Sequence, residues 1–358
     1  MTISEVTAPD QYKLVITEII DEAPDVKTFR VRPVDGEKIT YEAGQFLVFA
    51  FDTVAGEERR SYSFSSSPVV EESMAFSVKR IPNGLFSRWL IDKTIPGDLL
   101  TCTGVAGLFT LPGSLTGTDC IVLFAAGIGI TPLFSILKTV LYQENTRIIL
   151  VYSNKTKQQA VFLPELQELE KQFPGRLTIE WLFSDHKNLL HTRLTRAYLA
   201  GFLKRLESGI ALSSCRFYMC GPADYMWLIN LLLEENGVLP EQIHREIFVN
   251  QRLPIPQAPP DTSGHVATIF IGTRTFRLPV TYPDTILSAA KKAGVRLPYS
   301  CEAGRCSGCI ARCTSGTVWM AYNEVLTEKD ISKGMVLTCV GYPIEGDITL
   351  TYETIPGA

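Results

Sequence analysis

Three cysteines lie within nine residues near the carboxyl end of the chain: Cys301, Cys306 and Cys309, in the stretch CEAGRCSGC. Cys339 follows 30 positions after the third. The spacing C-x4-C-x2-C with a distant fourth cysteine is typical of a plant-type [2Fe–2S] cluster. Such a cluster is negatively charged, so its loop must wrap it closely with backbone N–H groups and shield it from water. Gly304 is small enough to allow that wrapping.

Other uses of these thiols are less consistent with the spacing. Zinc usually takes paired, short-spaced Cys or Cys/His sets, and the nearest histidine, His265, lies far upstream. Cys313 is a fifth candidate for four places, and its more ordinary interpretation is a small buried residue on the strand that follows. The sequence therefore predicts a cluster whose ligands are Cys301, Cys306, Cys309 and Cys339.

Two stretches near the amino end carry polar residues that suit a bound phosphorylated group. RRSYSFSSSP places Arg60, Tyr62 and Ser63 at the end of a predicted strand, whose alternation points the first two to one side and Ser63 to the other. KRIPNGLFSRWL supplies Gly84 and Ser87 where a helix is expected to begin, and helix N-termini bind phosphate. Each stretch alone is also compatible with an ordinary turn.

A glycine-containing turn follows the apolar run IVLF, in the stretch AAGIGITP. Gly127 and Gly129 permit a close approach of the backbone to a pyrophosphate, Thr131 can cap the next helix, and Pro132 suits its first turn. The stretch lacks the third glycine of the dinucleotide fingerprint. A plain strand-to-helix turn therefore remains an equal alternative at this point.

The elements that must position these residues fall into three groups. From residue 12 to about 112, short β-type runs separated by Gly, Pro and Asp predict an antiparallel barrel or sandwich. From 119, strands alternate with helices and predict a parallel sheet with helices on both faces. Residues 251–264 hold four prolines and indicate an extended linker. After the linker we expect a hairpin, a short helix ending at Gly294, the cysteine loop and a final strand, DITLTYE.

The composition bounds the class of protein. The chain has 358 residues, 46% of them hydrophobic and 20% charged, which suits two or three globular domains. A net charge of −4 argues against nucleic-acid or anionic-membrane partners. The apolar stretch CIVLFAAGIGITPLFSIL raises the question of a membrane span, but its Gly-x-Gly interruption favours a strand, a turn and a helix. The start, MTISEVTAPD, shows no secretory signal, so we expect a cytoplasmic protein whose clustered cysteines hold a cofactor.

The motifs RSYS, GLFS, GIGITP and CGPADYM occur in this order in the ferredoxin–NADP reductase superfamily, which the chain resembles from about residue 12 to 353. With its appended cluster domain, it is similar to the three-domain reductase components of the phenylacetyl-CoA epoxidase, ketosteroid hydroxylase and hybrid-cluster-protein type. The resemblance implies an antiparallel flavin-binding β-barrel (1–113), a parallel-sheet NAD(P)-binding α/β domain (114–250), a linker (251–263) and a β-grasp ferredoxin domain (264–358).

The resemblance also implies roles for individual residues around the flavin. Arg60 would hold a flavin phosphate, Tyr62 would lie against the isoalloxazine ring, and Ser63 would sit near the reacting flavin nitrogen. Gly84 and Ser87 would meet a pyrophosphate, which favours FAD over FMN.

Further positions follow from the same resemblance. Ser63, Cys220 and Glu246 would be catalytic, with Cys220 beside the nicotinamide, and Phe248 would reach the flavin. Without the family context, Cys220 could equally be a buried strand-end thiol and Phe248 an interdomain core residue. The remaining cofactor-binding positions that the resemblance implies are Val78, Lys79, Gly127, Gly129, Thr131, Asn154, Lys155, Gly221 and Pro222.

The nucleotide can be NADH or NADPH. NAD sites often present an acidic residue to the ribose at a later strand end, whereas VYSNKTKQQ offers Asn154, Lys155 and Lys157, and a cation there suits the 2′-phosphate of NADPH. Lysines at a strand end are also ordinary surface residues, so the lean toward NADPH is slight.

These features together predict an electron-transfer reductase that takes a hydride from NAD(P)H and passes electrons through FAD and the cluster, one at a time, to a protein acceptor such as an oxygenase. A stand-alone diaphorase or ferric reductase is a second interpretation. A redox sensor is a third, although a sensor needs no site that handles hydride.

Overall fold

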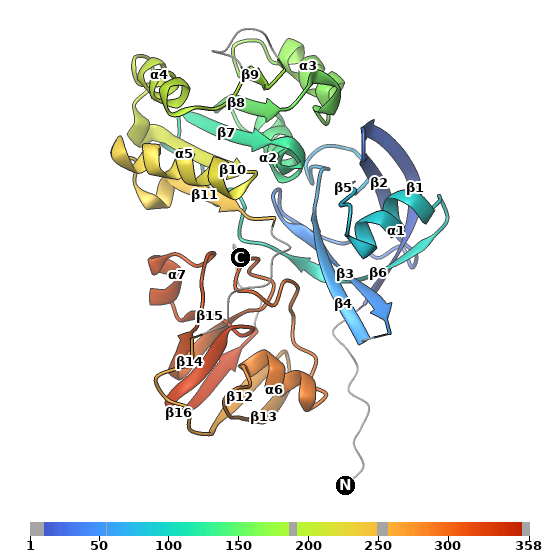
Figure 1. Ribbon diagram of the computed structural model, residues 1–358, viewed down its shortest axis with the longest axis vertical. Coiled ribbons are helices and arrows are strands. Elements are labelled where there is room, and N and C mark those ends of the chain that lie inside the picture. Colours follow the sequence, from blue (N-terminus) through green and yellow to red (C-terminus); the bar gives the residue numbers. More distant parts are fainter. Residues whose placement is uncertain (1–10, 55, 186–191, 249–256, 353–358) are drawn as a thin grey trace.

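The computed structural model describes residues 11–54, 56–185, 192–248 and 257–352. Within them the strands form three separate sheets, of six, five and five strands. Figure 1 shows the three parts as successive colours: a blue barrel, a green-to-yellow layer above it and an orange-to-red part below. The predicted succession of an antiparallel part, an α/β part and a second, smaller sheet is confirmed.

The first sheet is antiparallel and curls on itself. Its strand order is β4-β3-β6-β1-β2-β5, and a bridge between Phe64 and Phe76 joins the two ends. Alternation along the strands buries apolar side chains such as Leu14, Phe29 and Phe49 in the interior. Its elements are β1 (Tyr12–Ala23), β2 (Val26–Pro33), β3 (Phe46–Thr53), β4 (Gly56–Ser63), β5 (Ala75–Lys79), α1 (Leu85–Lys93) and β6 (Leu99–Ala106).

The second sheet is parallel, with the order β11-β10-β7-β8-β9. Its central strand is apolar on both sides because helices cover both faces: Ile121 and Leu123 pack with α2 and α3, whereas Val122 and Phe124 pack with α4 and α5. Its elements are β7 (Cys120–Ala126), α2 (Ile130–Gln143), β8 (Arg147–Asn154), α3 (Leu163–Gln172), β9 (Leu177–Phe183), α4 (Arg196–Glu207), β10 (Cys215–Cys220), α5 (Ala223–Glu235) and β11 (Ile243–Glu246).

The third sheet is mixed, with the order β13-β12-β16-β14-β15 and a parallel pairing of β12 with β16. The predicted hairpin and short helix are present, and the helix buries Ile286 and Leu287 in the core of this part. The final strand begins earlier than the run DITLTYE, and a short helix that the sequence did not predict precedes it. The elements are β12 (His265–Ile271), β13 (Arg274–Val280), α6 (Ile286–Lys292), β14 (Ile310–Met320), α7 (Glu328–Ser332), β15 (Met335–Leu337) and β16 (Gly341–Thr351).

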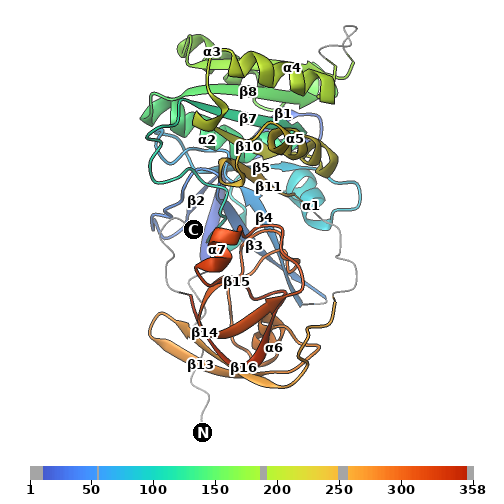
Figure 2. The ribbon, with the colours of Figure 1, turned by 90° about the vertical axis from the view of Figure 1, so that its left-hand side faces the viewer.

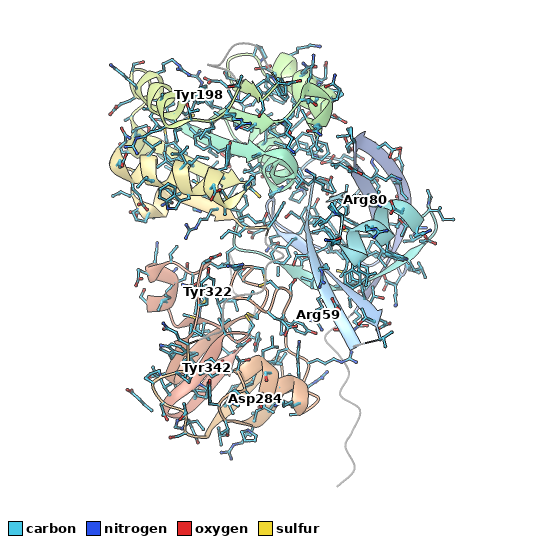
Figure 3. The ribbon with its side chains drawn as sticks, in the orientation of Figure 1. Arg59, Arg80, Tyr198, Asp284, Tyr322 and Tyr342 are labelled. Atoms are coloured by element: carbon cyan, nitrogen blue, oxygen red, sulfur yellow. The ribbon has the colours of Figure 1, made fainter. Side chains whose placement is uncertain are left out.

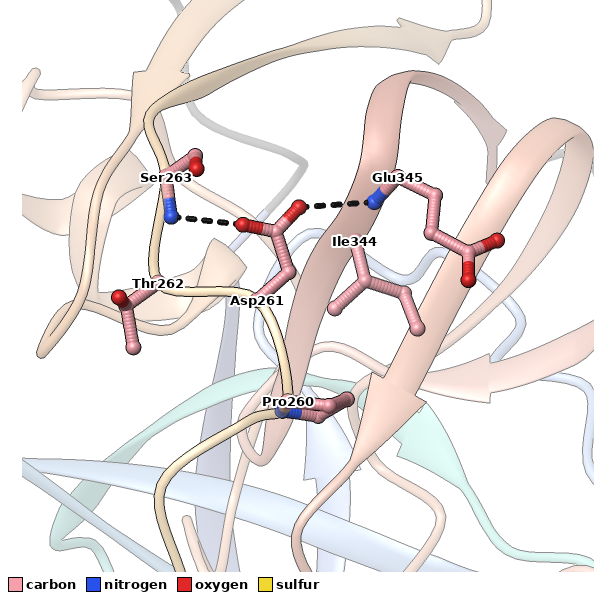
Figure 4. Close-up of a pocket in the computed structure, with 6 residues that line it drawn as sticks. All are labelled: Pro260, Asp261, Thr262, Ser263, Ile344 and Glu345. Atoms are coloured by element: carbon pink, nitrogen blue, oxygen red, sulfur yellow. Dashed lines mark hydrogen bonds between the residues drawn. The ribbon is translucent and has the colours of Figure 1, made fainter.

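Asp261 attaches the start of the third part to the rest of that part through hydrogen bonds. It lines a pocket of about 510 Å³ (Figure 4). Its carboxylate accepts hydrogen bonds from the backbone N–H groups of Ser263 (2.8 Å) and Glu345 (2.9 Å) and pairs with His265 at 2.7 Å. These bonds hold the pKa of Asp261 below its usual range. The residues before this anchor belong to the predicted linker, whose first six residues, 251–256, lie outside the described residues.

Each part has its own apolar core, and Figure 2 shows the barrel between the α/β layer and the third part. The stretch CIVLFAAGIGITPLFSIL folds as predicted, into β7, a 3₁₀ turn (Gly127–Gly129) and α2. No described helix combines the length and the apolar character that a membrane span requires.

Candidate functional site

Strand β4 presents Arg60 and Tyr62 on one side. The Arg60 guanidinium pairs with Glu58 at 2.7 Å and lies over the ring of Phe86, 4.7 Å from its centroid. The Tyr62 ring packs on Phe49 and Phe76, and burial raises the pKa of its hydroxyl. The strand therefore sets a cation and a neutral aromatic ring on one surface, as the alternation predicted.

Helix α1 begins at Leu85 with a free N-terminus. Gly84, its N-cap residue, provides no side-chain cap, and the first turn carries no acidic residue. The Ser87 hydroxyl accepts a hydrogen bond from the Ile81 N–H (3.1 Å) and donates one to the Gly84 carbonyl (3.3 Å). Ser87 therefore closes the preceding turn, and the helix N-terminus keeps N–H groups available for an anion.

Ser63 joins the barrel to the end of β11. Its hydroxyl donates to Glu246 Oε2 at 3.0 Å. Burial raises the pKa of Glu246 to about 8, although this hydrogen bond opposes the shift. Burial, with the Glu246 charge nearby, also raises the pKa of Cys220 well above its ordinary value. The three residues that the sequence proposed as catalytic are thus close together and mostly uncharged at neutral pH.

The 3₁₀ turn after β7 fits tightly under the end of β10. A Cβ atom on Gly129 would stand 2.2 Å from the Cys220 carbonyl oxygen, so only glycine fits there. This close approach is to the protein's own backbone. The predicted helix cap at Thr131 is wrong: Thr131 lies inside α2, and its hydroxyl donates to the Ile128 carbonyl at 2.8 Å because α2 already begins at Ile130.

The remaining predicted nucleotide-binding residues lie at the ends of the parallel strands. Asn154 ends β8, and the backbone carbonyl oxygens of Asn154 and Lys155 accept hydrogen bonds from Ser184 and Asp185. Gly221 and Pro222 follow β10 and lead into α5. Parallel strands bring these positions to one edge of the sheet, where open α/β sheets bind nucleotides.

The four predicted cluster ligands lie in two pairs. The Cys301 thiol is hydrogen-bonded with Cys306, and Cys309 with Cys339. Among the described residues, no three His, Cys, Asp or Glu side chains converge to hold one metal ion, so the thiols are arranged two by two. Backbone N–H groups of Cys301 and Ala303 point at the sulfurs of Cys306 and Cys301, each at 3.4 Å.

The loop that carries Cys301, Cys306 and Cys309 makes a tight bend at Gly304, as a loop that encloses a cluster requires. Gly304 has a φ of +69°, and a Cβ there would stand 2.8 Å from the Tyr322 carbonyl. Arg305, whose charge could offset that of a cluster, pairs instead with Glu324 at 3.1 Å. Cys313 lies on β14, as predicted, and is partly buried.

One cleft of about 2240 Å³ lies between the three parts and brings most of the candidates together. Of the predicted positions, those that line it are Arg60, Tyr62, Ser63, Lys79, Gly84, Ser87, Thr131, Glu246, Phe248, Cys301, Cys306 and Cys339.

The other predicted positions lie outside the walls of this cleft. Val78 is 1% exposed and belongs to the barrel core, so its side chain is not part of the site. Cys309, the last cysteine of the cluster loop, is buried. The positions at or beside the strand ends of the α/β part, also outside the walls, are Gly127, Gly129, Asn154, Lys155, Cys220, Gly221 and Pro222.

The sequence did not identify several residues of the cleft. His244 on β11 stacks on Tyr218 with 4.4 Å between ring centroids, and burial beside Arg216 lowers its pKa to about 4. Arg59 and Ser61, on the opposite side of β4 from Arg60, also line the cleft. The only sequence signal for Arg59 was that RRSYS contains two arginines. The contacts of Arg59 and Ser61 with Tyr299 and Ser300 are distant in sequence, so no local pattern shows them.

The residues present fit the three groups that the motifs imply. Two thiol pairs, three of their members on one wrapped loop and the fourth, Cys339, between β15 and β16, match a [2Fe–2S] cluster. An uncapped helix N-terminus beside Arg60 matches a flavin pyrophosphate. The parallel strand ends match a dinucleotide.

Comparisons with known proteins agree with this geometry. Three family models match the chain: an oxidoreductase FAD-binding domain over residues 13–111, an oxidoreductase NAD-binding domain over 123–229, and a 2Fe-2S iron-sulfur cluster binding domain over 269–343. FAD, a nicotinamide nucleotide and a [2Fe–2S] cluster are therefore the cofactors of this chain.

Relatives match over nearly the whole length. The chain is 31% identical over 352 residues to the 3-ketosteroid-9-alpha-monooxygenase ferredoxin reductase component of Rhodococcus rhodochrous, covering 95% of this chain and 96% of the relative. It is 29% identical over 365 residues to one of the subunits of the Escherichia coli 1,2-phenylacetyl-CoA epoxidase, covering 99% and 97%. The solved structure of phthalate dioxygenase reductase shares the fold, with a TM-score of 0.59 at 22% identity, covering 96% of this chain and 100% of that chain.

Proposed function

The chain belongs to the family of oxygenase reductase components in the ferredoxin–NADP reductase superfamily, and from that premise we propose that it carries electrons from NAD(P)H through FAD and a [2Fe–2S] cluster to an oxygenase partner. The observation that carries this proposal is the cleft in which the flavin strand, Glu246 and three of the four predicted cluster cysteines meet.

The three cofactors divide the chemistry because a hydride carries two electrons, whereas an oxygenase centre accepts them singly. When bound, FAD takes the hydride's two electrons and passes them one at a time to the cluster. The chain contributes position and electrostatics. Arg60 and the α1 N-terminus hold the phosphates, and the Tyr62 ring forms a wall for the isoalloxazine.

Ser63 and Glu246 line the place where the nicotinamide would meet the flavin, and Cys220 is buried beside Glu246 on the neighbouring strand. With Cys220 as a neutral thiol and Glu246 protonated up to about pH 8, the pocket adds no charge where hydride moves. The Ser63 hydroxyl keeps its proton directed at Glu246 Oε2. Phe248, 45% exposed on the cleft wall, is placed to exclude water from this region.

We assign the domains to residues 1–113, 114–250 and 264–358, with 251–263 as the linker. The gap between β6 and β7 and the start of β12 at His265 support these limits. We also place the protein in the cytoplasm. None of the nine cysteines forms a disulfide, which suits a reducing compartment that supplies NAD(P)H.

The purified protein tests this function. We expect flavin and cluster absorbance together with NAD(P)H-driven reduction of cytochrome c. A form truncated before residue 264 should keep ferricyanide reduction, which needs only the flavin, and lose most cytochrome c reduction. Equal cytochrome c rates for both forms would indicate a simple diaphorase, and a full-length protein without nucleotide-driven activity would indicate a sensor.

A further inference from the structure

The side of β4 that faces away from Arg60 and Tyr62 contacts the ferredoxin domain. Because side chains alternate along a strand, Glu57, Arg59 and Ser61 share this second side. Figure 3 shows Arg59 where the barrel approaches the orange part of the chain. One strand therefore holds flavin-site residues on one side and domain contacts on the other.

Arg59 makes the central contact. Its side chain is only 7% exposed and pairs with Glu57 at 2.8 Å. Its guanidinium carbon lies 3.8 Å from the centroid of the Tyr299 ring, and its Nη1 donates to the Tyr299 carbonyl oxygen at 3.3 Å. Lys291 lies over the same ring, also at 3.8 Å. Arg59 of the barrel thus contacts both the ring and the backbone of Tyr299.

The next contact along the strand reaches the cluster loop. The hydroxyls of Ser61 and Ser300 are hydrogen-bonded to each other, and Ser300 immediately precedes the cluster ligand Cys301. Leu108, just after β6, packs on the core of the ferredoxin domain. We name the three residues Glu57, Arg59 and Ser61 the β4 seat.

The β4 seat lies at the accessible side of the cluster loop. Cys309 and Cys339 are buried at 2% and 8% exposure, whereas Cys301 and Cys306 are partly exposed. An outside protein that takes an electron from the cluster must therefore approach from the side of Cys301 and Cys306. Ser300, beside that pair, is the residue that the seat holds.

We propose that the β4 seat is a reversible docking surface for the ferredoxin domain: it holds the cluster loop at the flavin site and must release it before a protein acceptor can reach the cluster. This proposal rests on the proposed function, because it concerns how the same cluster meets two partners in turn. The contacts of the seat are a charged ring contact and hydrogen bonds, and polar interfaces of this kind suit transient association.

A disulfide across the seat tests the release step. In the full-length holoprotein, S61C/S300C replaces two hydroxyls already in hydrogen-bond contact, and oxidised glutathione under anaerobic conditions supplies the oxidant. We expect the crosslink to appear in non-reducing peptide mass spectrometry. Ser332 of α7 is exposed, and its hydroxyl donates to the Lys329 carbonyl within its own helix, so S61C/S332C is the matched control and should form no crosslink.

The crosslinked protein should retain ferricyanide reduction and bleaching of the cluster by NAD(P)H but lose at least tenfold in cytochrome c reduction. Treatment with dithiothreitol, followed by its removal, should restore the rate. Failure of the crosslink to form, or a fully crosslinked protein that reduces cytochrome c at the rate of the single-cysteine variants, would overturn the proposal. If the uncrosslinked protein fails to reduce cytochrome c at all, the proposed function fails instead.

Substitution of Arg59 tests the docking step. R59M keeps the length of the stem but loses the charge over Tyr299, so we expect cluster bleaching by NAD(P)H to slow about tenfold, equivalent to about 1.4 kcal/mol. R59K should recover part of the rate because an ammonium can also lie over the ring. Y299F, which loses only a 3.5 Å contact with Glu57, is the conservative control. Equal bleaching rates in R59M and the unsubstituted protein would contradict the docking role.

Discussion

Glu246 is the single residue whose protonation we expect to matter most for hydride transfer. Its pKa rises from an ordinary value of 4.5 to about 8 because burial disfavours the carboxylate. The folded state therefore favours the protonated acid. Any stability linked to this proton is complete below about pH 4.5 and is lost as the pH rises through about 8.

The rate of flavin reduction should follow the same ionisation. As the pH rises above about 8, a buried negative charge forms beside Ser63 and Cys220, and we expect reduction by NAD(P)H to fall by up to about tenfold per pH unit. E246Q keeps a neutral side chain of the same size and should show no such decline. Stopped-flow flavin absorbance at 450 nm or so measures both profiles, and a decline that persists unchanged in E246Q would assign the ionisation to another group.

Gly129 is the residue on which the 3₁₀ turn after β7 depends for its shape. G129A forces a Cβ against the Cys220 carbonyl, and we expect a loss of about 2–3 kcal/mol in the free energy of unfolding. Gly113 is the control, since an added Cβ there meets nothing within 4 Å, and G113A should leave stability within about 0.5 kcal/mol. Urea unfolding followed by circular dichroism compares the stabilities of the two variants. Equal stabilities would mean that the turn can shift away from the Cys220 carbonyl at no cost and would contradict the prediction.

At the scale of elements, β4 shows how a strand can serve two sites. Its Arg60 side should bind the flavin phosphates, so R60A should weaken FAD affinity by about ten- to a hundredfold, the cost of a charged hydrogen bond. Quenching of flavin fluorescence in titrations of the apoprotein measures this. Arg32, exposed on β2 of the same sheet and outside the cleft, provides the control R32A. Equal FAD affinities of R60A and R32A would show that Arg60 does not bind the flavin phosphates.

Which of these features the sequence reveals depends on how local they are. Cys301, Cys306 and Cys309 follow one another in a loop, so their spacing reports the wrapping directly. The Ser63 contact with Glu246 could be expected only from the resemblance. Arg59 contacts Tyr299, 240 positions away, and no local pattern contains that pairing. The cap expected at Thr131 is wrong because α2 begins at Ile130, and its N-cap position is held by Gly129, where the approach of β10 leaves no room for a side chain.

At the scale of the whole molecule, the ferredoxin sheet encloses its own core, whereas Val26, Ala43 and Phe109 of the barrel part pack into the core of the α/β part. The functional cleft is formed where the three parts meet. Arg59, Ser61 and Ser63 reach across this cleft with few contacts. The ferredoxin domain therefore has a core that sets its own stability, whereas its described contacts with β4 across the cleft are a small number of polar interactions. We therefore expect that loss of the cluster lowers the thermal stability mainly of the ferredoxin domain that binds it.

Removal of the cluster tests that division. Cys309 and Cys339 belong to the ferredoxin core, so the cluster binds the folded state of that domain and stabilises it by mass action. Loss of even ~2 kcal/mol shifts the midpoint of a domain of this size by about 10 °C. Scanning calorimetry of the holoprotein and of a form stripped of iron should thus show one transition moving down while the flavin-dependent transition stays in place. A single transition that moves as a whole would mean that the β4 seat couples the domains more strongly than its few polar contacts allow.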